Sequence, residues 1–207
     1  IEIINSISTD ISKLRTTLLE SCLKTLKYNI NRKNKNNRFF EFGKIYEKIN
    51  NSNTEKRRLG IVYSGEIIPN SWNSKSKNAD FYYLKNIIIN ILQKFSITCE
   101  ERIIDLHDFE KVLALYSNDS RIAIIGLIST NINKEFEINQ KVYYASLDID
   151  KVLNKQTNTF QKYDPISKFQ SVSKDMAFIF DKSINYSEIK DLILKSNIKN
   201  LSSVNLF

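Results

Sequence analysis

The sequence is poor in glycine, proline, cysteine and histidine, and it has no long hydrophobic run. Its 207 residues include four glycines, two prolines, two cysteines and one histidine. So few cysteines and histidines argue against a zinc site, and four scattered glycines leave no glycine-rich phosphate loop. No apolar run approaches the roughly 18 residues that a membrane-spanning helix needs. The composition therefore favours an ordinary folded domain.

Length and hydrophobic content predict one large domain, or one domain with part of another. Hydrophobic residues make up 42% of the chain, enough for a core without disulfides. Cys22 and Cys99 lie far apart, so two reduced thiols in the cytoplasm are expected. The chain begins with Ile1 and shows no basic region followed by an apolar run, so we expect a segment from inside a longer protein, without a signal peptide.

The net charge of +8 has two interpretations. A basic surface would attract nucleic acid. Lysine, asparagine and isoleucine are all abundant, however, and all three have AT-rich codons. Nucleotide bias can therefore raise the charge without selection for a basic surface, and the sequence leaves both interpretations open.

Apolar spacing predicts the secondary structure of the first 155 residues. The first helix has Thr17 and Glu20 at the spacing of a capping box, with leucines and Cys22 on one face. The first two strands, separated by a polar loop, are expected to pair antiparallel. The expected elements are helices at 16–27, 82–95 and 150–153, a weaker helix at 108–116, and strands at 38–48, 59–66, 121–129 and 142–148.

The pattern restarts after a polar, unpatterned stretch. Residues 156–164 are predicted to be a linker between domains 1–155 and 165–207. In the second domain we expect a strand at 174–181, a helix at 187–196 with Ser187 as its N-cap, and a strand beginning at 201.

Two segments near the start have a recognisable residue order. They read Leu14-Arg15-Thr16-Thr17-Leu18-Leu19 and Phe39-Phe40-Glu41-Phe42-Gly43. In that order and spacing they resemble the family of bacterial phenylalanyl-tRNA synthetase β subunits, whose pattern is Leu-Arg-Thr-Ser-Leu-Leu-Pro-Gly-Leu-Leu, a helix, then Leu-Phe-Glu-Ile-Gly. Glu20-Ser21 stand in place of Pro-Gly.

The resemblance extends over nearly the whole chain. Trp72 and the segment 79–85 are similar to the family's Trp and Val-Asp-Phe-Phe-Asp-Leu-Lys, and 142–148 to its closing strand. Residues 166–177 and 204–207 resemble the start of a ferredoxin-fold anticodon-binding domain. The resemblance implies an α+β fold: a class II aminoacyl-tRNA synthetase-like antiparallel sheet with flanking helices, then a truncated ferredoxin-like half domain.

The residues that would bind ATP in an active class II synthetase are replaced here. Tyr46-Glu47 occupy the place of one phosphate-binding arginine, and Ala145-Ser146-Leu147-Asp148 occupy the place of a glycine-rich turn that ends in the other. No catalytic residue and no metal ligand is therefore predicted. By the resemblance, the domain is non-catalytic, and the α subunit of a heterotetramer of two α and two β subunits uses ATP and Mg²⁺.

The resemblance also suggests contact residues. Arg15, Leu18, Leu19 and Trp72 are assigned to the subunit interface, with Arg15 bracing the helix start rather than contacting substrate. The residues assigned to tRNA contact are Lys168, Phe169 and Lys174. The basic run 31–35 with Arg38 is expected to be a solvated loop, with an RNA patch as the alternative, and His107 a surface residue.

The resulting hypothesis is part of the β subunit of phenylalanine–tRNA ligase, scaffolding the α subunit and contacting tRNA(Phe). Two alternatives stay open at this point. One is a free-standing RNA-binding paralogue without an α partner. The other is an active class II-like ligase with rebuilt ATP contacts, which an arginine facing a deep cleft on the sheet would favour.

Overall fold

The computed structural model describes residues 13–50, 52–155 and 169–206. The chain divides into two compact units, Ile1–Gln161 and Lys162–Phe207. Each unit is described by itself. Among the described residues, no helix is long and apolar enough to cross a membrane.

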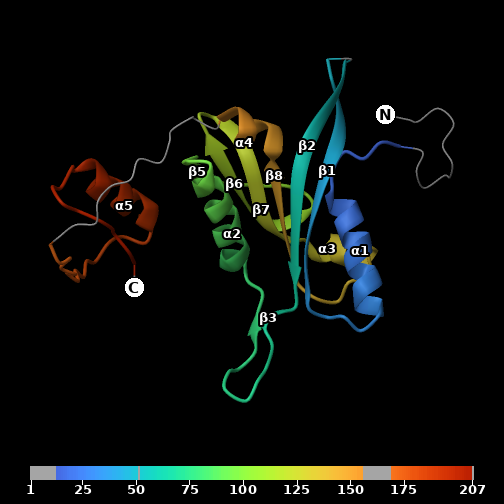
Figure 1. Cartoon of the computed structure of the whole chain (residues 1–207), viewed down its shortest axis with the longest axis horizontal. Helices are drawn as coiled ribbons and strands as arrows, with labels where there is room; N and C mark the ends of the chain where they lie inside the picture. The colour runs from blue at the N-terminus through green and yellow to red at the C-terminus, as the bar shows by residue number, and fades with distance from the viewer. Residues whose placement is uncertain (1–12, 51, 156–168, 207) are drawn as a thin grey trace. The chain divides into compact units, whose positions relative to one another are not determined.

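A six-stranded antiparallel sheet forms the first unit (Figure 1). Its strand order is β1-β2-β8-β7-β6-β5. The bounds are β1 Asn37–Ile49, β2 Ser52–Ser64, β5 Glu100–Ile104, β6 Phe109–Ser117, β7 Ser120–Ile128 and β8 Val142–Asp148. This agrees with the predicted antiparallel sheet with flanking helices.

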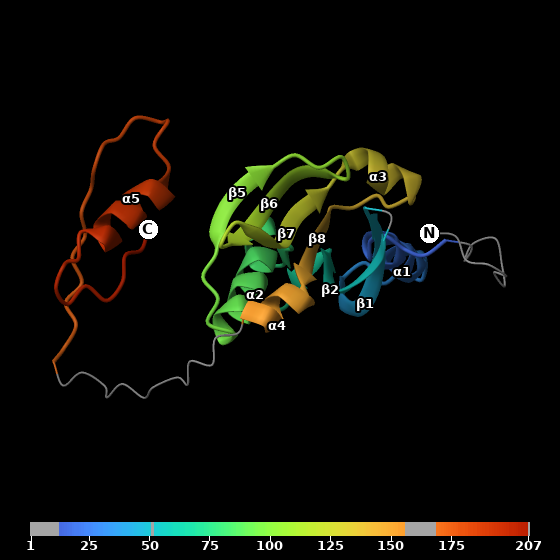
Figure 2. The same cartoon turned by 90° about the horizontal axis from the view of Figure 1, so that it is seen from above.

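Helices cover both faces of the sheet. The helices are α1 Leu19–Asn31, α2 Phe81–Lys94, α3 Thr130–Glu135 and α4 Ile149–Lys155. One core joins α2 and α4 to the sheet, and the other joins α1 and α3 to the opposite face (Figure 2). The central strand β8 shows this: Tyr143 belongs to the α2 core and Tyr144 to the α1 core, and both are buried.

The first helix has the predicted apolar face but begins three residues later. Leu19, Cys22, Leu23 and Leu26 are buried beneath it. Its capping differs from the prediction, because the Thr17 hydroxyl accepts from the backbone N–H of Leu19 at 3.1 Å and no capping hydrogen bond joins Thr17 to Glu20. The helix also extends past the predicted end at residue 27.

The first hairpin is longer than predicted. The polar stretch between the expected strands continues the ladder, so that Ile49 pairs with Ser52. Asn50 adopts a φ of 47°, which an asparagine tolerates in a tight turn. An ion pair of 2.6 Å joins Lys44 to Glu55 across the two strands. Polarity there marks two solvated strand faces, not a loop.

The prediction of a helix at 108–116 is wrong, because strand β6 occupies this range from Phe109 onward. Its apolar residues fit either periodicity, and pairing with β5 and β7 on its two edges selects the extended form. Asn118 and Asp119, with φ of 49° and 56°, make the two-residue turn into β7. The Asn118-Asp119 pair is the sequence signal from which this hairpin could have been predicted.

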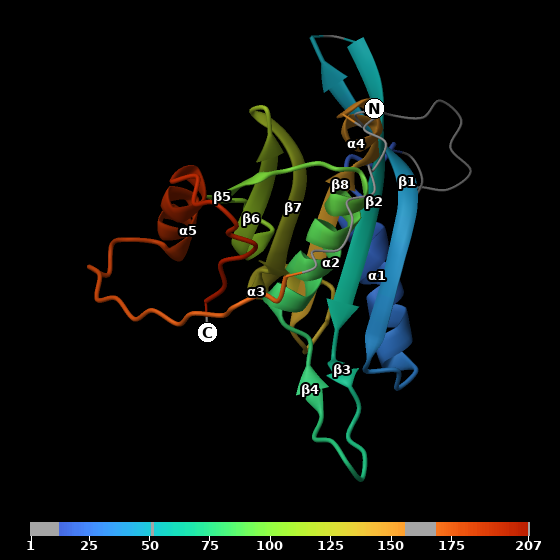
Figure 3. The ribbon, with the colours of Figure 1, turned by 60° about the vertical axis from the view of Figure 1, so that its left-hand side comes forward.

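The second predicted strand, 59–66, stops early because of Gly65. Its φ is +87°, and a Cβ there would lie 2.5 Å from the Asn36 side-chain oxygen. The chain then turns into a small hairpin of β3 Glu66–Ile68 and β4 Lys77–Asn78, which projects past the sheet (Figure 3). Helix α2 follows, capped by the Asp80 carboxylate on the Tyr83 N–H at 2.7 Å.

The remaining elements of the first unit follow the predicted pattern with small shifts. Strands β7 and β8 occupy the predicted ranges to within one residue, and α4 includes the predicted short helix. Strand β5 and helix α3 were not predicted. Ser129 is the N-cap of helix α3, and its hydroxyl accepts from the Ile132 N–H.

In the second unit only the helix was predicted correctly. Helix α5 spans Tyr186–Lys195, and its N-cap is Asn185, not the predicted Ser187. The strands predicted at 174–181 and from 201 onward do not form within residues 169–206, because no segment there pairs with their backbone. The whole predicted linker, residues 156–164, lies outside the described residues.

Candidate functional sites

Arg15 joins the segment before α1 to the middle of β1 by hydrogen bonds and an ion pair. Its Nε donates to the Lys44 carbonyl at 2.8 Å, and its Nη1 forms an ion pair with Glu41. The Arg15 carbonyl accepts from the Tyr46 N–H at 2.9 Å. The Ser21 hydroxyl, from α1, donates to the other Glu41 oxygen at 2.6 Å. Arg15 thus braces the helix start, as the structural interpretation predicts.

Gly43 leaves the space that the Arg15 side chain occupies. A Cβ at Gly43 would collide with Nη2 of Arg15, so the side chain of Arg15 needs a glycine at this position of the strand. Cys22 is buried beside Glu41, and burial together with this carboxylate raises the pKa of Cys22 to about 12. The thiol therefore stays protonated, and the cluster is suited to packing rather than nucleophilic chemistry.

The two positions that replace ATP-binding arginines are occupied by paired acids. Glu47 accepts from Lys56 at 2.6 Å. Asp148 is 1% exposed and pairs with Arg58 at 3.2 Å. Arg58 and Arg121 do line a pocket, but its volume is about 150 Å³. Ordinary ligand sites occupy about 300–1,000 Å³. The alternative of a rebuilt ATP-dependent ligase is therefore not favoured.

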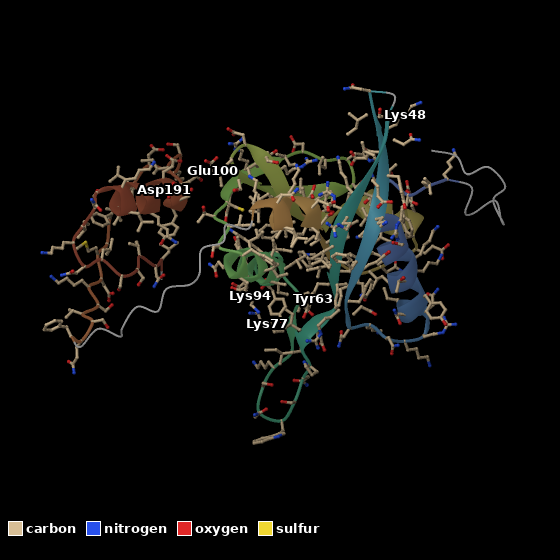
Figure 4. The ribbon with its side chains drawn as sticks, turned by 45° about the horizontal axis from the view of Figure 1, so that its top comes forward. Lys48, Tyr63, Lys77, Lys94, Glu100 and Asp191 are labelled. Atoms are coloured by element: carbon tan, nitrogen blue, oxygen red, sulfur yellow. The ribbon has the colours of Figure 1, made fainter. Side chains whose placement is uncertain are left out.

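The four predicted interface residues separate into two groups. Leu18 and Leu19 are 1% and 5% exposed, so as placed they are part of the core and offer no surface to a partner. Arg15 is partly exposed. Trp72 is 96% exposed in the loop between β3 and β4, where Ser71 and Ser74 form a bridge on either side of it. Figure 4 places Tyr63 and Lys77 near the base of this hairpin.

An apolar groove lies on the α2 face of β1 and β2. It has a volume of about 410 Å³. We call it the Phe40 groove, and its lining residues are Arg38, Phe39, Phe40, Leu59, Ile61, Tyr63, Ile87 and Ile91. Phe40 is 72% exposed, and Phe42, two residues along the same face, is 58% exposed. Helix α2 packs mainly on β7 and β8, so it leaves this edge of the sheet open.

The sequence reasoning missed the Phe40 groove. Phe40 and Phe42 were assigned to a strand, but their face could not be told from that of Phe39. The available signal is the alternation with Glu41 and Gly43, which the Arg15 contacts place on the α1 face. The two exposed phenylalanines then have to point to the other face.

Two of the three predicted tRNA-contact residues are among the described residues of the second unit. Phe169 is 87% exposed, and Lys174 is also exposed. Lys168 lies outside the described residues. Several other apolar side chains of this unit are exposed as well, among them Met176 and Phe178.

The basic run after α1 forms a shallow polar hollow. Its volume is about 490 Å³, and its lining includes Lys33, Lys35 and Arg38. The guanidinium of Arg32 stacks on the Tyr28 ring at 3.3 Å.

His107 has a side chain that is 90% exposed, as expected for a surface residue. Among the described residues no group of three or more His, Cys, Asp or Glu side chains is placed to hold a metal ion.

Comparison with known proteins identifies relatives over the whole chain. The sequence pattern of the family described as "Phenylalanyl tRNA synthetase beta chain CLM domain" matches residues 1–149. The phenylalanine–tRNA ligase β subunit of Bacteroides thetaiotaomicron is 31% identical over 99% of this chain and 27% of its own length. That of Francisella tularensis is 32% identical over 100% of this chain and 26% of its own length. The chain thus spans roughly a quarter of these relatives.

Solved structures agree on the fold. Pyrrolysyl-tRNA synthetase from Desulfitobacterium hafniense superposes with a TM-score of 0.51 and 15% identity, covering 67% of this chain and 48% of that one. At this identity the likeness concerns the fold alone, which is that of an aminoacyl-tRNA synthetase. The match of the family pattern over residues 1–149 shows that the chain belongs to the phenylalanyl-tRNA synthetase β-chain family, through its CLM domain.

Proposed function

We propose that this chain is part of the β subunit of a cytoplasmic phenylalanine–tRNA ligase and that it scaffolds the α subunit. The observation that carries the proposal is the Phe40 groove. Phe40 in the groove and Phe42 beyond it are both exposed, whereas the opposite face of the sheet is covered by α1 and α3. Contiguous exposed apolar side chains of this kind mark protein interfaces.

The partner contact includes the tip of the β3–β4 hairpin. Trp72 is 96% exposed. The hydroxyls of Ser71 and Ser74, 2.9 Å apart, form a hydrogen bond across the turn that contains Trp72. Tryptophan on an ordered turn is a typical interface anchor because it buries a large area at a low entropic cost. The groove and the hairpin are therefore proposed as two parts of one interface.

The chain itself is proposed not to activate phenylalanine. Glu47 and Asp148 are engaged in ion pairs with Lys56 and Arg58, so these two cations are not available to a nucleotide phosphate. ATP and Mg²⁺ would serve the α subunit of the holoenzyme. Purified alone, the chain should give no phenylalanine-dependent exchange of pyrophosphate into ATP, and it should co-purify with an α subunit. Exchange that is lost on mutating Arg58 would overturn the proposal.

Contact with tRNA(Phe) is proposed for the second unit. Residues 165–207 would be the beginning of an anticodon-binding domain, joined by the linker 156–164. Phe169 and Lys174 are exposed, which suits base stacking and phosphate contact. Weak tRNA binding that falls steeply between two salt concentrations, and that drops further on Lys174→Gln, would support this contact. Equal binding by the variant would place the RNA contact elsewhere.

A further inference from the structure

A small pocket lies on the α1 face of the sheet, beside the Arg15 cluster. Its volume is about 150 Å³. Its polar lining residues are Thr16, Thr17, Glu47, Arg58, Arg121 and Ser146. They come from the segment before α1 and from strands β1, β2, β7 and β8. Five segments thus meet around one space, and none of the contacts described above fills it.

The charges around the pocket leave one cation uncompensated. Glu47 is neutralised by Lys56 at 2.6 Å, and Asp148 by Arg58 at 3.2 Å. Arg121 makes no ion pair with any residue in the described ranges. The pocket is therefore positive overall, and an anion would be attracted to it.

A buried donor at the pocket has no partner among the described residues. The Nε–H of Arg58, which lines the pocket, has no acceptor there. Buried donors are normally paired, so this one indicates an acceptor that occupies the pocket.

We propose that the pocket binds a small organic carboxylate. Carboxylate oxygens only accept hydrogen bonds, which matches the guanidinium of Arg121 and the buried Nε–H of Arg58. The remaining wall is apolar and includes Leu18, Ile45 and Ile124, which suits a short hydrocarbon group. An inorganic phosphate would leave that wall unfilled. The volume admits a carboxylate of a few carbons and excludes a nucleotide. This site is independent of the proposed α-subunit interface.

Isothermal titration calorimetry of the chain tests the proposal. Sodium isobutyrate, sodium acetate and sodium phosphate are titrated separately, with ionic strength held constant by chloride. Isobutyrate should bind saturably with a stoichiometry of about one, and more tightly than acetate or phosphate, because it alone fills both the polar and the apolar walls. Arg121→Gln should weaken isobutyrate binding at least tenfold, because Arg121 supplies the unpaired charge.

Two further variants make the test specific. Arg102→Gln removes an exposed arginine of β5 that pairs with Glu100 and Asp119, and it should bind isobutyrate like the unmodified chain. Ser146→Val removes no charge but fills the pocket from β8, and it should weaken binding as much as Arg121→Gln. The proposal is overturned if isobutyrate gives no saturable heat, if phosphate binds more tightly, or if Arg121→Gln binds unchanged.

Discussion

The two faces of strand β1 differ in their exposure to solvent. Toward α1, Glu41 and Gly43 contact Arg15, and Ile45 is 5% exposed. Toward α2, Phe40 and Phe42 are 72% and 58% exposed. The alternation of one strand thus sends neighbouring residues either into the fold or out to the surface.

This difference indicates that the apolar residues of one strand serve two separate functions, stability of the fold and association with a partner. Those on the α1 side are enclosed by helix and arginine, and their loss should cost stability. Those on the α2 side have no helix above them, and their loss should cost association with a partner. The predictions below measure stability and association separately on the two sides.

Truncating the closed side should have the largest effect. Leu23→Ala removes a side chain that is 0% exposed in the α1 core, and it should lower the free energy of unfolding by about 2–5 kcal/mol. Phe40→Ala on the open side should change it by less than about 0.5 kcal/mol. Urea unfolding of both variants gives the comparison. Equal losses would mean that the Phe40 groove is part of the core.

Trp72→Ala should weaken association with the α subunit and leave stability unchanged. Exposed tryptophans that become buried at an interface contribute about 2 kcal/mol or more. The dissociation constant should therefore rise about thirtyfold. Ile103→Ala is the control, because Ile103 is 85% exposed on β5, at the opposite edge of the sheet. A similar loss in both variants would remove the hairpin from the interface.

Gly43→Ala should destabilise the chain by about 1 kcal/mol by displacing Arg15 from Glu41. A double-mutant cycle isolates this cause. In an Arg15→Ala background, Gly43→Ala should cost much less, because the colliding atom, Nη2 of Arg15, is gone. An unchanged cost would place the strain in the strand backbone or at Leu18, which a Cβ would also approach, at 3.1 Å.

The smallest effect should come from the exposed ion pair of α4. The backbone N–H of Arg57, then its guanidinium, hold the pKa of Asp150 below its ordinary value of 3.8. Because the folded-state pKa is depressed, this stabilisation is present above pH 3.8 and is lost as the pH falls through the folded-state pKa. The chain and Asp150→Asn should therefore differ slightly in melting temperature at pH 6 and converge as the pH is lowered below 3.8. A constant difference would exclude this linkage.

The sequence was most informative where one face of an element is enclosed. The leucines of α1 predicted their own burial from helical spacing, and the runs in β7 and β8 predicted buried strands. Strand β6 was mistaken for a helix because the order of its apolar residues suits both periods. Pairing with β5 and β7, which lie on its two edges, selects the strand conformation.

The Phe40 groove could not have been predicted from local spacing. It exists because α2 packs on β7 and β8 and stops short of β1, which depends on the whole sheet order. The Arg15 brace was anticipated in kind, but the sequence did not indicate Glu41 as its partner. The pocket beside Arg121 depends on five segments that lie far apart in the sequence.

The central claim is that the open side of β1 is the surface that binds the α subunit. Its most direct test is the dissociation constant of the α subunit for three chains: unmodified, Phe42→Asp and Ile103→Asp. Both substitutions put a carboxylate at an exposed apolar position of a strand. The account predicts that Phe42→Asp weakens binding at least a hundredfold while Ile103→Asp binds like the unmodified chain. Unchanged binding by Phe42→Asp would contradict it.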